Sequence, residues 1–130
     1  MQTFLPYPNF EQSAKVLDRQ RLGKQRVEVL TLLKGGWKNH PASKMWHGHE
    51  RYLALYGMAI CDEWISRGYK DTCREKIKFY FERQSGSPPP WLGREDFHAS
   101  HRSNLLRKSP DYYGKFGWAE GPDLPYVWPC

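Results

Sequence analysis

Glycine and proline residues divide this chain of 130 residues into four segments, each long enough to form a helix. The breaks are the glycine pair at 35–36, Gly68, the run 85–90 with its three prolines, and the Ser-Pro pair at 109–110. Glycine loses the most conformational entropy when it is ordered, and proline lacks the N–H group that a helix interior needs. Apolar side chains recur at three- and four-residue spacings between these breaks, so the sequence predicts a mostly α fold.

The first helix is expected over residues 10–33. Asn9 can cap it, and Gln12 three residues later completes a capping-box-like pattern. Asp18 or Gly23 could interrupt this segment, so we allow a kink there.

Two further helices are expected in the middle of the chain. Pro41 suits the first turn of the second helix, which Gly68 ends. Asp71 or Thr72 could cap a third helix that runs to about Arg83.

A fourth helix is expected over residues 95–108. Residues 1–8 hold two prolines and should be extended, while residues 111–130 are rich in Pro, Gly and aromatic side chains and suit an irregular tail over the helices. The loop 85–90 is too short for a domain boundary. We therefore predict a single compact helical domain over 1–130, whose six Trp, eight Tyr and six Phe supply its core.

Several classes of protein are excluded by composition and patterning. No stretch approaches the roughly 20 apolar residues of a membrane helix, and no secretory signal begins the chain. Cys61, Cys73 and Cys130 are odd in number and lack paired spacing, so we expect reduced thiols. These features predict a cytoplasmic protein, which we expect to be a monomer.

The clearest electrostatic feature is a basic cluster over residues 15–26, within a chain of formal charge +6. Such a cluster favours a phosphate backbone, because each neutralised phosphate releases counterions and Arg adds bidentate geometry. A solvated helix face has the same composition, so both interpretations stay open. The cluster sets one acid, Asp18, against Lys15, Arg19, Arg21, Lys24 and Arg26.

The C-terminal third interleaves cations with aromatic side chains, from Arg102 and Asn104 through Arg107 and Lys108 into residues 112–118. Aromatic rings can stack on exposed bases while cations hold phosphates. The same rings could equally seal the core.

Four histidines have side chains of a type that binds metals. His47 and His49 would diverge on a helix, and His98 and His101 could share a face but lack an evident third ligand. We therefore expect no metal site and no cofactor. A metal-dependent nuclease that uses His47, His49 and either His98 or His101 is kept as an alternative.

Glu28 lies on the same expected helix as the basic cluster. A carboxylate among phosphate-binding residues is unfavourable unless it has a chemical task, although it could pair with Lys24 four residues earlier. The residues alone leave both interpretations open.

Three blocks of the chain, in preserved order, resemble the pyrimidine dimer DNA glycosylases of the phage endonuclease V type, in a divergent bacterial and phage branch. The first block begins Arg19-Gln20-Arg21-Leu22 and places Glu28 where that family has its catalytic glutamate. The others are Gly48-His49 with residues 62–72, and His98-Ala99-Ser100 with Tyr112-Tyr113-Gly114-Lys115.

The resemblance implies a DNA glycosylase with associated lyase activity on an all-α fold. In that mechanism a terminal α-amine attacks the sugar carbon bearing the damaged base, forms an imine and permits β-elimination. An α-amine, with an ordinary pKa of about 7.7 to 8.0, is more available than lysine near 10.4. Gln2 is bulky, so Met1 is expected to stay and to be the nucleophile, with Glu28 as the essential carboxylate.

The implied partner is double-stranded DNA that contains a damaged or modified base, most of all a pyrimidine dimer. Val27 stands where the family has an arginine, and Arg26 is the expected substitute. Alternatives are a glycosylase for another modified base and a non-catalytic DNA-binding protein on the same scaffold. The expected DNA contacts are Thr3, Arg19, Gln20, Arg21, Lys24, Arg26, Arg102, Asn104, Tyr112, Tyr113 and Lys115.

Overall fold

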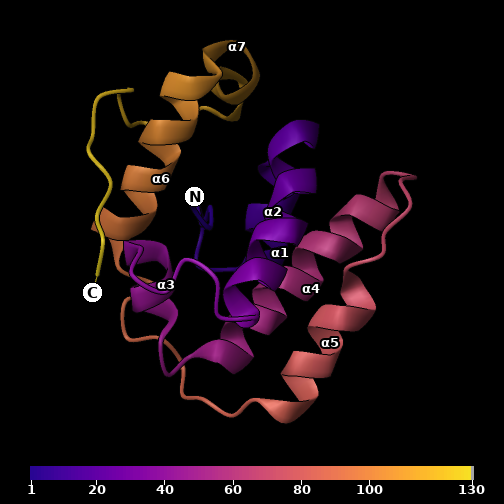
Figure 1. The fold of residues 1–130 in the computed structure, drawn as a ribbon. Coiled ribbons are helices and arrows are strands. Elements are labelled where there is room, and N and C mark those ends of the chain that lie inside the picture. The colour runs from indigo at the N-terminus through magenta and orange to yellow at the C-terminus, as the bar shows by residue number, and fades with distance from the viewer. Residues whose placement is uncertain (130) are drawn as a thin grey trace.

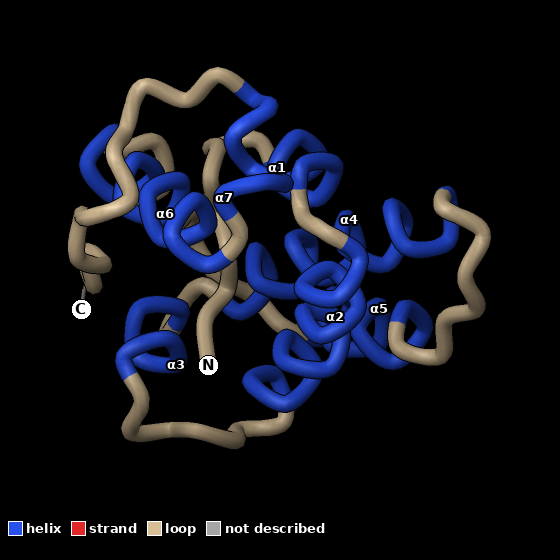
Figure 2. Tube along the Cα trace, turned by 90° about the horizontal axis from the view of Figure 1, so that it is seen from above, coloured by secondary structure: helices blue, strands red, loops and turns tan. Residues whose placement is uncertain are grey.

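The computed structural model describes residues 1–129, and within them all regular secondary structure is helical (Figure 2). This confirms the prediction of a mostly α fold. Cys61 and Cys73 are free and buried, while the thiol expected at Cys130 lies outside the described residues. The elements in chain order are α1 (Phe10–Val16), α2 (Arg19–Leu33), α3 (Pro41–Trp46), α4 (Glu50–Ser66), α5 (Arg74–Arg83), α6 (Glu95–Lys108), α7 (Pro110–Tyr113) and the 3₁₀ helix η1 (Gly114–Phe116).

The segment expected to be helical over residues 10–33 forms two helices, and the break lies at Asp18, one of the two positions where an interruption was allowed. Asn9 caps α1 as expected, since its side chain accepts the Gln12 N–H at 2.9 Å. The chain then leaves the helical conformation, and Asp18, with ψ 159°, caps α2 by accepting the Arg21 N–H. Gly23 lies inside α2 and does not interrupt it. The Trp64 ring packs where a side chain at that position would lie.

The second expected helix is also divided, into α3 and α4. Gly48 has φ +83°, a conformation that glycine adopts without strain, and it turns the chain between them. α5 begins at Arg74 with Cys73 as its N-cap residue, so the expected cap at Asp71 or Thr72 is wrong. The Asp71 carboxylate still accepts the backbone N–H groups of Cys73 and Arg74 at 3.2 and 2.8 Å.

The fourth helix, α6, has the expected bounds, but the tail is more regular than expected. Pro110 starts the short helix α7, as its fixed φ suits a first turn. Gly117, with φ +70°, ends the 3₁₀ helix that follows. Beyond it the chain runs without helix over α6 (Figure 1).

Helices α1, α2 and α5 pack around α4, and α6 with α7 forms the other side of the molecule (Figure 1). The N-terminal segment runs between α2 and α6 in both views (Figures 1 and 2). No helix within residues 1–129 is long and apolar enough to cross a membrane.

Residues 2–6 are extended, as expected, and buried. Thr3 Oγ1 accepts a hydrogen bond from the Trp46 indole at 3.0 Å, and the Tyr56 hydroxyl donates to the Phe4 carbonyl at 2.6 Å. The Leu5 N–H donates to His101 Nδ1 at 2.8 Å. Side chains from three helices therefore fix this segment and with it the position of the first residue.

Candidate active site

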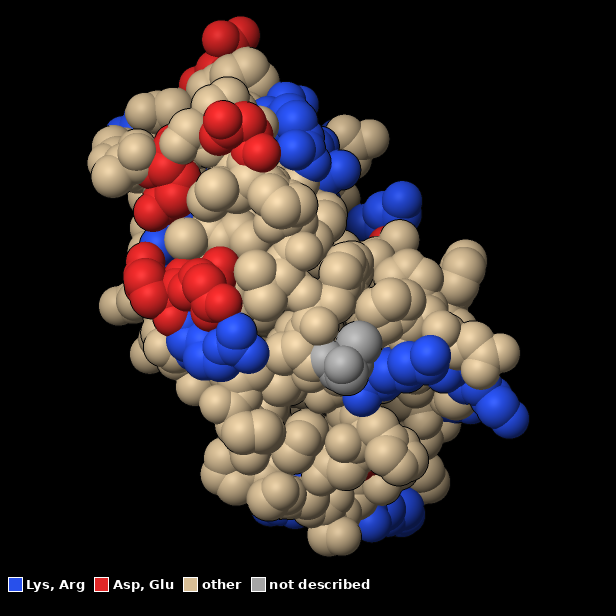
Figure 3. All heavy atoms as spheres, turned by 90° about the vertical axis from the view of Figure 1, so that its left-hand side faces the viewer, with Lys and Arg blue, Asp and Glu red and all other residues tan. Residues whose placement is uncertain are grey.

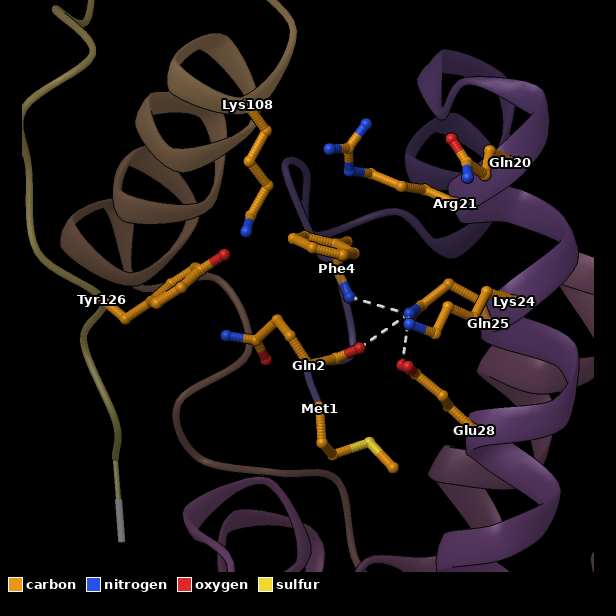
Figure 4. A pocket seen from close by; sticks show the side chains of 10 residues that line it. All are labelled: Met1, Gln2, Phe4, Gln20, Arg21, Lys24, Gln25, Glu28, Lys108 and Tyr126. Atoms are coloured by element: carbon orange, nitrogen blue, oxygen red, sulfur yellow. Dashed lines mark hydrogen bonds between the residues drawn. The ribbon is translucent and has the colours of Figure 1, made fainter.

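The N-terminus lies in a cavity of about 360 Å³ between α2, α6 and the C-terminal tail (Figure 4). This volume is within the range of ligand-binding pockets. Its two expected catalytic residues, Met1 and Glu28, line it together. The full lining is Met1, Gln2, Phe4, Gln20, Arg21, Lys24, Gln25, Glu28, Lys108 and Tyr126.

Gln25 joins the N-terminal segment to Glu28. Its amide nitrogen donates to the Gln2 carbonyl at 2.7 Å and to Glu28 Oε2 at 2.9 Å. Its amide oxygen accepts the Phe4 N–H at 3.0 Å and lies 2.8 Å from the Tyr56 hydroxyl. This buried residue was missed in the sequence, where the one signal is its position three residues before Glu28 on the same helical face.

Glu28 is half-buried, and burial raises the pKa of its carboxyl above the ordinary value. The charges of the N-terminal amine and of Lys24, together with hydrogen bonds from the Gln2 backbone and the Gln25 amide, offset part of that increase in pKa. The sequence left open whether Glu28 has a chemical task or pairs with Lys24. In the structure its side-chain hydrogen-bond partner is Gln25 rather than Lys24. The Glu28 carboxyl, which holds its proton more tightly than usual, therefore lies close to the N-terminal amine.

Three residues of the expected DNA contacts on α2 line this cavity, namely Gln20, Arg21 and Lys24. Arg21 also pairs with Asp18 at 3.1 Å. Arg19 is exposed, with its guanidinium 5.8 Å from the centre of the Tyr69 ring.

Arg26 points away from the cavity. It pairs with Asp71 at 2.6 Å, and its guanidinium lies 4.4 Å from the Trp64 ring centre. Val27 stands where the resembling family has an arginine, and Arg26 is not placed to take over the role of that arginine beside Glu28. The guanidinium that lines the cavity belongs to Arg21.

Four expected DNA contacts are buried, so they present little or no surface to DNA in this structure. Thr3 and Asn104 have no exposed surface, and the Asn104 amide donates to the carbonyls of Ser100 and Leu124. Tyr113 has none either, and its hydroxyl donates to Asp18. Their polar groups hold the fold together, which corrects their assignment from the sequence.

Arg102, the fourth of these residues, is 8% exposed and forms ion pairs with Glu95 and Glu120. It also donates to the Pro6 carbonyl at 2.8 Å, so its cation anchors the N-terminal segment to α6. Its charge is compensated within the protein and is not free for a phosphate.

The last expected contacts lie on the α7 and η1 side of the molecule. Lys115 is exposed, and its ammonium lies 4.0 Å from the centre of the half-buried Tyr112 ring. The two residues form a cation–aromatic pair outside the cavity.

The histidines serve the fold. His98 Nδ1 donates to the Leu5 carbonyl, and its Nε2 accepts the Gly93 N–H. Burial lowers the pKa of both His98 and His101, the latter to about 3. His49 Nδ1 contacts the Ser87 carbonyl at 2.8 Å, and His47 is exposed. Nowhere in residues 1–129 do three His, Cys, Asp or Glu side chains gather as a metal site would require.

Charge is unevenly distributed over the face that α6 and the tail form. Acidic side chains gather on one side of it, and Lys and Arg side chains are spread over the other (Figure 3). Along α6 the first turn carries Glu95 and Asp96, whereas the last carries Arg107 and Lys108. The basic end is the one that lines the cavity, through Lys108.

A family model described as pyrimidine dimer DNA glycosylase matches residues 1–77 of the chain. The matched part includes Met1, Gln25 and Glu28 and ends within α5. No curated protein and no solved structure matches the chain significantly.

Proposed function

Because this chain belongs to the pyrimidine dimer DNA glycosylase family, we propose that it excises a damaged base from DNA through an imine with the Met1 amine and then cleaves the strand. The observation that supports this proposal is the shared cavity, in which Gln25 connects the first residues to Glu28. A pyrimidine dimer is the proposed substrate.

The proposed chemistry begins with the neutral amine of Met1, whose lone pair attacks C1′ of the damaged nucleotide. The C1′–N bond to the base breaks, and the base keeps that electron pair and takes up a proton while it stays joined to its neighbour in the dimer. The amine then loses a proton, and the C1′–O4′ bond breaks as O4′ takes up a proton, so that a protonated imine joins C1′ to Met1. Glu28 stabilises the cationic sugar and moves protons, a task suited to a carboxyl whose pKa is raised.

Strand cleavage follows from the same imine. Loss of a proton from C2′ breaks the C3′–O bond, and the electron pair leaves with the 3′ phosphate. Water then hydrolyses the imine and releases Met1. In this mechanism the amine is that of Met1, and the carboxylate that moves protons is that of Glu28.

The cavity walls suit a DNA backbone. Arg21 and Lys24 come from α2 and Lys108 from α6, so cations face the cavity from both sides. Exposed Arg19 and Lys115 extend the basic surface. Neutralised phosphates release counterions, so we expect binding to weaken steeply as salt is added.

Strand cleavage at dimers in ultraviolet-irradiated duplex DNA tests the proposal, because the excised pyrimidine stays joined to its neighbour through the cyclobutane ring and is not set free. The wild-type chain should cleave the strand, and Glu28→Gln should reduce the rate by roughly 100-fold or more while it keeps DNA binding. The control is Glu11→Gln, which changes an exposed carboxylate outside the cavity and should have no effect. DNA binding without strand cleavage by the wild type would instead support a non-catalytic DNA-binding protein.

A further inference from the structure

Two buried polar atoms that line the cavity have no hydrogen-bond partner among residues 1–129. They are the amide nitrogen of Gln2, a residue only 6% exposed, and the hydroxyl of Tyr126. A third such atom, His101 Nε2, lies in a ring that packs edge-on against Tyr126 and does not line the cavity. Buried polar groups are normally paired, so the two in the cavity require an explanation.

The orientation of the Gln2 amide is fixed by its other end. Its oxygen accepts the Thr3 N–H at 2.9 Å, which leaves the NH₂ group for the cavity. Figure 4 shows this nitrogen directed away from Glu28 and toward the side of Tyr126. Gln2 can therefore only donate hydrogen bonds to a bound molecule.

The Tyr126 hydroxyl is a second donor on the same side. Burial raises its pKa to about 12, so the group stays protonated at neutral pH. The ammonium of Lys108 also points to this side of the cavity (Figure 4). Donors thus line the wall formed by α6 and the tail, and the one carboxylate, Glu28, is on the opposite wall.

We infer that the Gln2 amide and the Tyr126 hydroxyl bind the carbonyl edge of a pyrimidine-2,4-dione ring that enters the cavity. This inference rests on the proposed function and names the part of the base that the site reads. A saturated pyrimidine ring in a dimer keeps both carbonyls, which are neutral acceptors. Neutral buried donors suit such carbonyl groups. A phosphate would lose more hydration free energy in this part of the cavity than hydrogen bonds from two neutral donors would regain, so exposed cations elsewhere bind it better.

Equilibrium binding to two duplexes tests the inference. One carries a thymine dimer and the other a tetrahydrofuran site, which has a sugar but no base and cannot form an imine. Binding is measured in the Glu28→Gln background, so that the dimer is not cleaved. Tyr126→Phe should weaken dimer binding roughly tenfold, the value of one hydrogen bond, and leave tetrahydrofuran binding unchanged. Gln2→Leu should act in the same direction.

Stability and a matched tyrosine separate this role from a structural one. Because the Tyr126 hydroxyl is unpaired, Tyr126→Phe should leave the melting temperature unchanged or raise it. The control is Tyr112→Phe, outside the cavity, which should affect both duplexes alike.

Two results would overturn the inference. One is an equal loss of affinity for both duplexes in Tyr126→Phe, which would place the hydroxyl on the backbone phosphate. The other is a protein that does not prefer the dimer to the tetrahydrofuran site. Selective binding of the dimer by a wild type that does not cleave the strand would leave the inference standing and remove the proposed function.

Discussion

Gln25 is the residue on which the geometry of the candidate site depends most. It lies within hydrogen-bond distance of four groups, of which two belong to the N-terminal segment and one is the Glu28 carboxylate. Since both ends of its amide are engaged, it cannot rotate without losing contacts on both sides. One buried side chain therefore links the N-terminal segment directly to Glu28.

Replacing Gln25 by Leu should reduce the rate of strand cleavage at the dimer by more than 100-fold and lower the free energy of unfolding by about 2 to 4 kcal/mol, because buried partners are left unpaired. Single-turnover kinetics and urea unfolding measure the two effects. Gln20→Leu on the same helix changes an exposed side chain without these bonds and should be as stable as the wild type. Full activity in Gln25→Leu would show that the amide does not position the site.

The raised pKa of Glu28 gives a pH-dependent stability effect with a defined sign. The folded protein holds this proton more tightly than the unfolded chain, so the stabilisation is present below pH 4.5 and is lost as the pH rises through the folded pKa. Glu28→Gln stays neutral throughout. Its melting temperature relative to the wild type should therefore increase between pH 4 and pH 7.5, and a constant difference would show that Glu28 is not destabilised by burial.

At the residue scale, the sequence indicated the proposed catalytic pair but not the residues that support it. The spacing from Leu22 to Glu28 carried the resemblance, and the chain brings Met1 and Glu28 to one cavity. Gln25 and Gln2 carry no charge and match no catalytic pattern, so little beyond the position of Gln25 three residues before Glu28 distinguished them from surface glutamines. Their importance comes from contacts with a segment that lies far away along the chain.

Among the elements, α4 is central because α1, α2 and α5 all pack on it. The close approach of α2 and α5 to α4 depends on Gly57, where an added Cβ would lie 2.6 Å from Val29 and 3.2 Å from Ile77. These are methyl carbons of buried side chains in α2 and α5, so they have little room to move.

Gly57→Ala should lower the free energy of unfolding by about 1 to 3 kcal/mol through overpacking of this contact. Gly114→Ala is the matched control, since that glycine has helical φ and ψ and no heavy atom within 4 Å of the new Cβ. The control substitution should leave the free energy of unfolding unchanged or raise it by up to about 1 kcal/mol. Denaturant unfolding compares them, and equal stability would mean that α4 does not pack this tightly.

The helices themselves were largely predictable, and their divisions were less so. The break at Asp18 depends on a residue of the tail, since the Asp18 N–H donates to the Tyr113 hydroxyl at 3.0 Å and its carboxylate accepts from the same group. Local propensity allowed either a continuous helix or a cap at this position. A contact across 95 positions of the chain selects the cap, and such a contact leaves no local signal.

For the whole molecule, the junction between the N-terminal segment and α6 contains buried neutral histidines. His101 accepts the Leu5 N–H, and its pKa is lowered to about 3 against an ordinary value of 6.5. His98 is shifted in the same direction. The unfolded chain therefore binds more protons than the folded protein once the pH falls below about 6.5.

His101 alone should make stability decline by up to about 1.4 kcal/mol for each pH unit between about 6.5 and 3, because its proton uptake favours the unfolded state. His101→Asn should be less stable at neutral pH but show a shallower decline, which thermal unfolding across this range measures. His47→Asn, which changes an exposed ring, should keep the wild-type slope. A wild type with constant stability down to pH 4 would contradict a neutral buried His101.

The charge distribution explains which expected DNA contacts were misplaced. Arg102 and Arg26 look like surface cations in the sequence, yet each is paired with carboxylates inside the fold. Composition cannot distinguish a cation whose partner is an acid of the same chain from one that is free for a phosphate. Arg21, Lys24 and Lys108 are the cations that the fold brings to the cavity, the first two from α2 and the third from α6.

The most direct test of the central claim is to trap the imine with borohydride and locate it. The protein is mixed with duplex DNA that carries a thymine dimer or an abasic site, and borohydride reduces the C=N bond to a stable amine. Peptide mapping by mass spectrometry should find the adduct on the α-amine of Met1 with both substrates, and acetylation of that amine should abolish it. An adduct on Lys24 or Lys108, or none on either duplex despite tight binding, would contradict the proposed mechanism.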